Sequence, residues 1–308
     1  MQNYKIKNSI GAGSFGDIYL ATDLRSNKDV AIKKIKLLDF KESTIKMIIT
    51  EIKIGYFNNC EYLTKILDFF LIDKIVHLVM PYYNQIDYKS AAKKLKLSNN
   101  QKTDIIYKIL LGVQYLHTNK VIHRDLKIGN IMMHNTSPFI GDFGTCNILP
   151  ENQYFTSTCI GTPYYLSPEI IQGDSYNTKV DIYSLGCTIC EIIYNKPPYS
   201  GSNIYMLYKN VLHDSKSVNI DISSKIGKLI NTMIDKDAIN RPLINDILLM
   251  YSKNFEIGKM KVYRKDNDFY EKIRIDFGVP NNLSKLNALF QKIKLIKSSD
   301  KLPSYPKI

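Results

Sequence analysis

The feature that most constrains this chain is the segment VIHRDLKIGN, at residues 121–130. It places a His, an Arg, an Asp, a Lys and an Asn within eight positions, between two apolar stretches. Polar side chains at this density are costly to order and to bury, so the fold that contains them must supply partners for them. The segment therefore predicts a chemical site whose other parts lie elsewhere in the chain.

The individual side chains of this segment suit phosphate chemistry. Asp125 can accept a proton from an attacking hydroxyl, an effect worth roughly 10²–10⁴-fold in rate. Lys127 can stabilise negative charge on a group in transit, and the amide oxygen of Asn130 is a hard ligand for Mg²⁺. Twelve residues after Asn130, the sequence GDFG supplies Asp142. Two oxygen ligands on separate loops fit a magnesium–nucleotide site, because Mg²⁺ keeps waters and phosphates in its other positions.

A glycine-rich segment, IGAGSFGDI at residues 10–18, has glycines in G-x-G-x-x-G spacing. Glycines let backbone N–H groups approach a polyphosphate where a Cβ would collide. Plain hairpin turns also use such glycines, and a Rossmann turn has this spacing but needs a helix directly after it. The residues that follow, DIYLATDL, are typical of a strand. The segment therefore predicts a loop that joins two strands and lies over phosphates.

The strand candidate DVAIKKI supplies Lys33, which can place a point charge on phosphate oxygens. Because side chains alternate along a strand, Lys33 shares a face with the small Ala31, which leaves room for a planar base, whereas Lys34 is expected at the surface. A lysine that faces a cavity needs a carboxylate partner. Glu51 lies on the apolar helical stretch that follows, whereas Glu42 at its start is explained by helix capping.

The order of the patterns predicts two parts and a tail. Short β-rich runs and one helical stretch fill residues 4–80, a polar stretch with a proline covers 81–87, and long helical patterns dominate 88–253. A cleft between two such parts is a favoured ligand site. Residues 254–308 hold 12 Lys and Arg against 6 Asp and Glu, a net charge of +6. This basic tail is expected to be partly helical, at LNALFQKIKLI, or disordered, and to suit acidic partners.

Composition excludes several classes of protein. The 308 residues are 44% apolar and 23% charged, as in an ordinary globular protein, and no apolar run is long enough for a membrane span. The N-terminal residues lack the apolar core of a signal peptide. Five scattered cysteines predict reduced thiols and a cytoplasmic or nuclear location. Cys187 and Cys190 form a C-x-x-C, but their apolar flanks favour a buried helix over a metal or redox site.

With these parts in this order, the chain resembles the eukaryotic protein kinases. The resemblance covers about residues 4–250 and predicts an α+β fold with two lobes, a small antiparallel sheet with one helix and a larger helical lobe. Lys127 and the segment GTPYYLSPE, at residues 161–169, are similar to the serine/threonine class and most similar to its NIMA-related branch. The matching segments are IGAGSFGDI, VAIK, the helix with Glu51, HRDLKIGN, GDFG, SPE, DIYSLG and NRP.

The resemblance implies how ATP would be bound. Lys33 would bind the α- and β-phosphates and pair with Glu51. Pro81 and Tyr83 would offer backbone groups to adenine, and Asp87 would reach the ribose hydroxyls. The residues expected to contact the nucleotide are Ile10, Gly11, Ala12, Gly13, Ser14, Phe15, Gly16, Ile18, Ala31, Lys33, Met80, Pro81, Tyr83, Asp87 and Met132.

In the helical lobe the resemblance implies that Asp125 is the catalytic base and that Lys127 acts beside it. Asn130 and Asp142 would hold Mg²⁺, or Mn²⁺ in its place. Thr162 would help to position Asp125 and Lys127.

Regulation is expected at Arg124, whose charge needs an anion. Phosphate on Thr158 is the hypothesis; the alternative is that the hydroxyls of this loop are solvated and that the loop orders unaided.

Other matching positions carry structure or depart from the family pattern. Asp181 would brace the backbone of residues 123–124, and Glu169 would pair with Arg241. Tyr183 stands where tryptophan is usual, a mild packing change. Gly55 stands where the family prefers a bulky apolar residue in the stack that links the lobes. The missing contact is expected to make the active arrangement less stable, by about 1 kcal/mol or more if a cavity remains there.

The function predicted is an ATP- and Mg²⁺-dependent serine/threonine protein kinase that acts on protein hydroxyls. A pseudokinase, which binds nucleotide without transfer, typically lacks Lys33, Asp125 or Asp142, and all three are present. The net charge of +13 is also typical of nucleic-acid-binding proteins. However, the lysines are spread along the chain, and no nucleic-acid-binding motif supports that function class. Gly129 removes an acid that kinases directed to basic substrates often use, so a strict basic preference is not expected.

Overall fold

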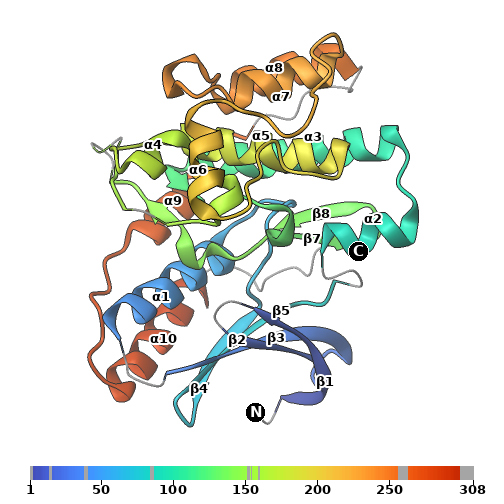
Figure 1. Ribbon diagram of the computed structural model, residues 1–308. Helices are drawn as coiled ribbons and strands as arrows, with labels where there is room; N and C mark the ends of the chain where they lie inside the picture. The colour runs from blue at the N-terminus through green and yellow to red at the C-terminus, as the bar shows by residue number, and fades with distance from the viewer. Residues whose placement is uncertain are drawn as a thin grey trace. The chain divides into compact units, whose positions relative to one another are not determined.

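In the computed structural model the chain forms two compact units. The first, which we call the sheet unit, combines Met1–Asn84 with Asn267–Ile308, and the second, the helical unit, is Gln85–Asp266. The structure describes residues 3–13, 16–37, 41–83, 87–150, 153, 155–158, 160–255 and 263–298. Figure 1 labels the α-helices and the strands β1–β5, β7 and β8.

The sheet unit is built on one antiparallel sheet of five strands in the order β1-β2-β3-β5-β4. Apolar side chains from one of its faces, including Ala21, Val30, Ile32 and Val79, form a buried cluster with Tyr4. The strands are β1 (Tyr4–Gly13), β2 (Gly16–Asp23), β3 (Lys28–Lys36), β4 (Asp68–Ile72) and β5 (Ile75–Pro81).

Helix α1 (Glu42–Phe57) follows β3, and its apolar residues are buried at helical spacing. The β-rich run LTKILDFFL, at residues 63–71, forms a strand only from Asp68 onward in the structure. The residues before it pack under the end of α1 instead: Ile66 is 3% exposed, and its backbone N–H donates to the carbonyl of Gly55 at 2.8 Å. Packing against a helix thus overrides strand propensity at this point.

Two helices from the predicted tail belong to the sheet unit. Helix α9 (Asn267–Arg274) packs against α1, and α10 (Leu283–Ser298) packs against β4. In Figure 1 the two tail helices are orange to red, α1 is blue and β4 is cyan. Phe269, Phe290 and Ile293 are buried there, and Phe290 meets Phe69 edge to face at 5.2 Å between ring centroids. The stretch LNALFQKIKLI lies within α10.

The helical unit carries the rest of the described elements. Its longest helix, α3, begins with a capping box in which Ser98 accepts from the N–H of Gln101 and the Gln101 side chain accepts from the N–H of Ser98. The helices are α2 (Tyr88–Leu95), α3 (Asn99–Thr118), α4 (Pro168–Gln172), α5 (Lys179–Tyr194), α6 (Ile204–Leu212), α7 (Lys225–Met233) and α8 (Ile244–Phe255). The short strands are β6 (Val121–Ile122), β7 (Ile131–His134), β8 (Ser137–Ile140) and β9 (Asn147–Ile148), and the 3₁₀ turns are η1 (Ile128–Asn130), η2 (Phe143–Thr145), η3 (Pro163–Tyr165) and η4 (Ala238–Asn240).

Helix α5 runs through the core of the helical unit, because it is apolar on nearly every face. Cys187 and Cys190 are fully buried on it, as predicted, and burial raises the pKa of both thiols, that of Cys190 to about 12. A Cβ at Gly186 would lie 2.7 Å from Ile234, so glycine allows α5 to approach the end of α7 closely.

The predicted fold class is confirmed: a small antiparallel sheet with α1 and the two tail helices forms one unit, and a mainly helical unit forms the other. Among the residues that the structure describes, none of the helices combines the length and the apolar character that crossing a membrane requires.

Candidate active site

Lys33 and Glu51 form a buried ion pair within the sheet unit. The Lys33 Nζ lies 2.8 Å from Oε1 and 3.0 Å from Oε2 of Glu51, and the two side chains are 8% and 7% exposed. Losing either partner of such a pair would leave a buried charge uncompensated. The pair therefore holds the lysine of β3 in a position set by α1.

The strand register places the expected adenine and phosphate contacts on one face of the sheet. Ile18 pairs with Lys33 across β2 and β3, and Ala31 pairs with Met80 across β3 and β5. Directly opposed residues share a face, and so do residues two apart on one strand. Ile18, Ala31, Lys33 and Met80 thus line the same face, whereas Lys34 lies on the other, with its Nζ 4.4 Å from the centre of the Tyr19 ring.

The glycine-rich segment joins β1 to β2, as the strand-like residues after it predict. Gly13 pairs with Gly16, and a Cβ at Gly16 would lie 2.0 Å from the carbonyl oxygen of Lys34, so only glycine fits. A Cβ at Gly11 would meet nothing within 4 Å. The expected contacts Ser14 and Phe15 lie outside the described residues, and Ala12 is described by its backbone in β1 only.

In the helical unit, Asp125, Lys127 and Thr162 form one hydrogen-bonded cluster. The Thr162 hydroxyl donates to Oδ1 of Asp125 at 2.6 Å and accepts from Nζ of Lys127 at 2.6 Å. The Lys127 Nζ also donates to Oδ2 of Asp125 at 2.7 Å. Asp125 is 6% exposed. Both oxygens of this carboxylate are therefore held, and the ammonium group lies beside it.

Asn130 and Asp142 have the chemistry of a magnesium site. The Asn130 amide nitrogen donates to the backbone carbonyl of Asp125 at 2.8 Å and to its Oδ2 at 3.0 Å. Since the amide hydrogens face Asp125, the amide oxygen is the atom left for a cation. The Gly141 N–H donates to the carbonyl of Asn130 at 2.9 Å, which ties the GDFG segment to η1. These two residues supply hard oxygen donors and fit Mg²⁺, with further positions left to phosphate and water.

Asp181, on α5, holds the backbone that leads into this cluster. Its carboxylate accepts from the N–H groups of His123 and Arg124, each at 2.8 Å, and is hydrogen-bonded to His117 Nε2 at 2.8 Å. Burial by itself would raise the pKa of Asp181, but the hydrogen bond and charge of His117, with His123, hold it below its ordinary value. The left-handed backbone at Arg124, with φ of 69°, is a strained conformation that these bonds stabilise.

The Arg124 guanidinium is hydrogen-bonded to oxygens that carry no full charge. It donates to the carbonyls of Thr145 and Cys146 at 2.6 and 3.3 Å, and it lies 3.4 Å from the hydroxyl of Tyr176. That hydroxyl donates to the backbone carbonyl of Thr158 at 2.6 Å. Thr158 itself is exposed. Tyr176 thus connects Arg124 to the predicted phosphorylation site.

The remaining residues expected to contact the nucleotide differ in burial and in the elements that carry them. Ile10 is half-buried in β1, Pro81 ends β5 and Tyr83 is buried after it, while 84–86 lie outside the described residues. Met132 is half-buried in β7. The Asp87 carboxylate caps α2 by accepting from the N–H and the hydroxyl of Ser90, at 2.8 and 2.9 Å. Its predicted ribose contact would compete with this cap.

The structural pairings implied by the sequence are also present. Glu169 and Arg241 form a two-fold contact, with Nη1–Oε1 at 2.6 Å and Nη2–Oε2 at 2.8 Å, and the arginine side chain is fully buried. Tyr183 stacks on Tyr199 and lies 4.9 Å from the Arg241 guanidinium carbon, so a tyrosine fills the position where tryptophan is usual. Sequence reasoning missed Tyr176 and His117, because nothing in their local sequence points to Arg124 or Asp181.

Comparison with known proteins decides the family. The sequence matches the family described as "Protein kinase domain" over residues 4–251. The chain belongs to the protein kinase family. This kinase is 31% identical to human "Serine/threonine-protein kinase Nek5" over 258 residues, 80% of this chain and 36% of that protein. It is 30% identical to "Probable serine/threonine-protein kinase nek3" of Dictyostelium discoideum over 296 residues, 92% of this chain and 26% of that one.

The likeness extends beyond one branch of the kinases. "Serine/threonine-protein kinase shk2" of Schizosaccharomyces pombe is 31% identical over 259 residues, which are 80% of this chain and 44% of that protein. The predicted family, its serine/threonine class and its likeness to NIMA-related kinases are confirmed. The chain spans less than half the length of these relatives.

Proposed function

We propose that this kinase transfers the γ-phosphate of ATP to serine and threonine hydroxyls of proteins. The observation that carries the proposal is the cluster of Asp125, Lys127 and Thr162. It combines a fixed carboxylate that can take a proton with an ammonium group that can stabilise phosphoryl oxygens. The serine/threonine kinases among its relatives support the same activity.

Each residue of the cluster has a distinct task in the proposed reaction. Asp125 receives the proton of the acceptor hydroxyl as that oxygen attacks. Thr162, which binds both Asp125 and Lys127, keeps the two charges at fixed positions. Lys127 lies 2.7 Å from the carboxylate and stabilises negative charge on the group in transit. Catalysis of this kind is mainly positioning and electrostatic stabilisation.

The nucleotide and metal would be held by residues whose chemistry fits them. Lys33, fixed by Glu51, would bind phosphate oxygens, and the open backbone at Gly11 would allow close approach of the phosphates. Mg²⁺, or Mn²⁺ in its place, would be held by Asn130 and Asp142. The metal would neutralise phosphate charge when it is bound. The apolar face that Ile18, Ala31 and Met80 share would take the adenine ring.

Asp125→Asn tests the proposed activity. Asparagine keeps the size of the side chain but cannot accept the proton, so Mg²⁺- and ATP-dependent labelling of a generic protein substrate should fall by about 10²-fold or more. Nucleotide binding, measured by the thermal shift with Mg·ATP, should be retained. Equal labelling by the variant and the wild-type protein would refute the role of Asp125. Binding of Mg·ATP by the wild-type protein without any transfer would favour a pseudokinase.

We also propose that phosphate on Thr158 raises activity. Thr158 is exposed, and the Tyr176 hydroxyl links its carbonyl to Arg124, whose guanidinium has no carboxylate partner in the described part of the chain. A phosphate there would give Arg124 a charged partner and would order the segment further. The competing hypothesis is that the backbone contacts with Tyr176, including the bridge to Thr156, suffice.

Thr158→Ala separates the two hypotheses. If phosphate on Thr158 orders the segment, the variant should lose activity, by about tenfold or more for an interaction of 1–3 charge-assisted hydrogen bonds. The matched control is Ser157→Ala, since Ser157 is also exposed and adjacent. Full activity of Thr158→Ala, with no phosphate found at Thr158 by mass spectrometry, would establish that the loop orders unaided.

We also propose a cellular location for the kinase. Cys60, Cys146, Cys187 and Cys190 are free and buried, which supports a reducing compartment, the cytoplasm or the nucleus. An affinity of the basic tail for acidic partners stays a prediction.

A further inference from the structure

A lysine-lined cavity lies beside the catalytic loop of the helical unit. It has a volume of about 610 Å³ and is lined by Lys89, Lys93, Lys96 and Lys102, with Ile128 and Glu191 among its other residues. The first three lysines come from α2 and its C-terminal cap, and Lys102 comes from the first turn of α3. Four ammonium groups and one carboxylate therefore face a single cavity.

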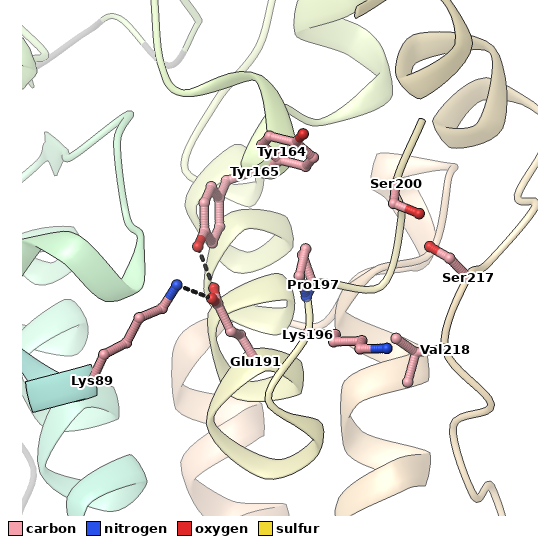
Figure 2. A pocket seen from close by; sticks show the side chains of 9 residues that line it. All are labelled: Lys89, Tyr164, Tyr165, Glu191, Lys196, Pro197, Ser200, Ser217 and Val218. Carbon is pink, nitrogen blue, oxygen red and sulfur yellow. Dashed lines mark hydrogen bonds and ion pairs between the residues drawn. The ribbon is translucent and has the colours of Figure 1, made fainter. Parts of the chain in front are cut away.

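A second cavity continues from the same residues. Its volume is about 510 Å³, and it shares Lys89 and Glu191 with the first while adding Tyr164, Tyr165 and Lys196. Figure 2 shows the Lys89 ammonium and the Tyr165 hydroxyl converging on the Glu191 carboxylate. The two cavities thus meet at the pair formed by Lys89 and Glu191.

Both carboxylate oxygens of Glu191 already have partners within the protein. Its Oε1 lies 2.8 Å from Nζ of Lys89, its Oε2 accepts from the Tyr165 hydroxyl, and its side chain is 6% exposed. A basic group of a substrate would have to displace Lys89 to reach this carboxylate. No other acidic residue lines either cavity among the described residues.

The other three lysines carry unneutralised charge. Within the described residues, Lys93, Lys96 and Lys102 form no ion pair, so their charges are available to a ligand. They line the same cavity, where their potentials add. Anionic groups that enter the cavity would be attracted, and cationic groups would be repelled.

Both cavities adjoin the residues that act on the acceptor hydroxyl. Ile128, on the wall of the first cavity, directly follows Lys127 and begins η1, against which α2 packs. Tyr164 and Tyr165, on the wall of the second, lie in η3, whose N-terminal cap is Thr162. A peptide whose hydroxyl reaches Asp125 would therefore extend its neighbouring residues into these cavities.

We propose that the lysines of α2 and α3 form a subsite that selects protein substrates with acidic residues, Asp, Glu or a phosphorylated residue, close to the acceptor serine or threonine. This inference rests on the proposed function and adds its substrate class. The position of Gly129, one residue after Ile128, supplies no acid that would favour basic side chains instead.

A positional peptide scan with charge reversal tests the subsite. Peptides with one serine carry Glu, Ala or Lys at each flanking position in turn, and kcat/KM is measured for the full chain and for the double variant Lys93→Glu/Lys96→Glu. The matched control is Lys94→Glu, because Lys94 is exposed on the same helix but lines neither cavity.

The expected result is a preference of about tenfold for Glu over Ala at one or more flanking positions, as two or three exposed charge pairs supply. The preference should disappear or reverse in favour of Lys in the double variant and persist in Lys94→Glu. It should also weaken as salt is raised. No preference for Glu in the wild-type protein, or an unchanged preference in the double variant, overturns the proposal.

Measuring peptide binding tests the subsite independently of phosphate transfer, and so separates this inference from the proposed function. A fluorescent acidic peptide should bind the full chain more tightly than its lysine counterpart, and the double variant should remove that difference even if no phosphate is transferred. Absence of transfer with selective peptide binding would refute the kinase activity alone. Equal binding of the two peptides would refute the subsite alone. A single-stranded oligonucleotide that displaces the acidic peptide and binds more tightly than it does would also refute the subsite alone.

Discussion

At position 55 the chain has a glycine, where the kinase family prefers a bulky apolar residue, and the sequence leaves open whether a cavity remains beside α1. The structure shows that the space is filled. A Cβ at Gly55 would lie 2.8 and 2.9 Å from the Cγ1 and Cδ1 atoms of Ile66, so the isoleucine occupies the space that a larger side chain would take. The volume is filled from the segment that precedes β4, and α1 needs no bulky residue there.

Gly55→Leu should therefore destabilise the protein although leucine favours helices. Overpacking of a filled core costs about 1–3 kcal/mol, more than the roughly 1 kcal/mol that glycine costs a helix relative to alanine. Urea unfolding measures the change in the free energy of unfolding. The control is Ile66→Ala in the same background, which makes room and should recover part of the loss. A more stable Gly55→Leu variant would show that Ile66 moves aside freely.

The contribution of Asp181 to the stability of the fold depends on pH. Its folded pKa is held below the ordinary value of 3.8, chiefly by His117 against the opposing effect of burial. A carboxylate with a depressed pKa stabilises the fold above its ordinary value, and this contribution is lost as the pH falls through the folded pKa.

Asp181→Asn should cost about 2–4 kcal/mol at pH 7, because buried N–H groups of His123 and Arg124 lose a charged acceptor. The gap in unfolding free energy between variant and wild type should narrow below about pH 4. Denaturant titrations at several pH values check this. A gap that stays constant into acid would mean that the charge of Asp181 does not contribute.

At the scale of elements, α10 covers part of the sheet unit. Phe290 and Phe69 are both fully buried where α10 meets β4, and Lys294 forms an ion pair with Asp68 at 2.6 Å. On the neighbouring surface, Lys53 of α1 donates to the carbonyl of Ile275. Burial of aromatic side chains supplies most of this attachment, since half-exposed ion pairs contribute little.

Phe290→Ala should lower the free energy of unfolding by about 3–5 kcal/mol, the usual cost of emptying a buried aromatic site. Amide exchange should speed up in α10 first and then in α1, which α9 contacts. Asn287→Ala, an exposed change on the same helix, is the matched control and should have little effect. Similar stability of both variants would indicate that α10 contributes nothing to the sheet unit.

Elements with strong local patterns were predictable. Alternation in DVAIKKI predicted which face of β3 carries Lys33, and helical spacing predicted α1, α3 and α5. The late start of β4 was not predictable, because residues 63–67 have strand propensity but pack under α1. The attachment of α9 and α10 depends on distant partners that no local pattern records.

Some residues of the candidate site were also predictable from the sequence, and others were not. Asp125, Lys127 and Asn130 belong to one short segment, so their proximity followed from spacing alone. The Lys33–Glu51 pair required a helix to pass the sheet, which the resemblance implied. Tyr176 and the lysines around Lys93 come from segments without a recognisable motif, and only the folded chain brings them to their partners.

For the whole molecule, positive charge is not spread evenly in the folded chain. The lysines behind the net charge of +13 are spread along the sequence, but four of them line one cavity in the helical unit. In the sheet unit, lysines of the tail lie over aromatic rings instead: Lys272 over Phe57, and Lys297 over Tyr56. The same residue type thus serves two purposes in the two units.

The match to the protein kinase domain family ends at residue 251, whereas the second part of the sheet unit begins at Asn267. A fragment trimmed to the region of homology would leave the aromatic surface at Phe69 and Tyr56 open to water, and such a surface promotes aggregation. Expression of the catalytic region should therefore extend through Ser298, the last residue of α10.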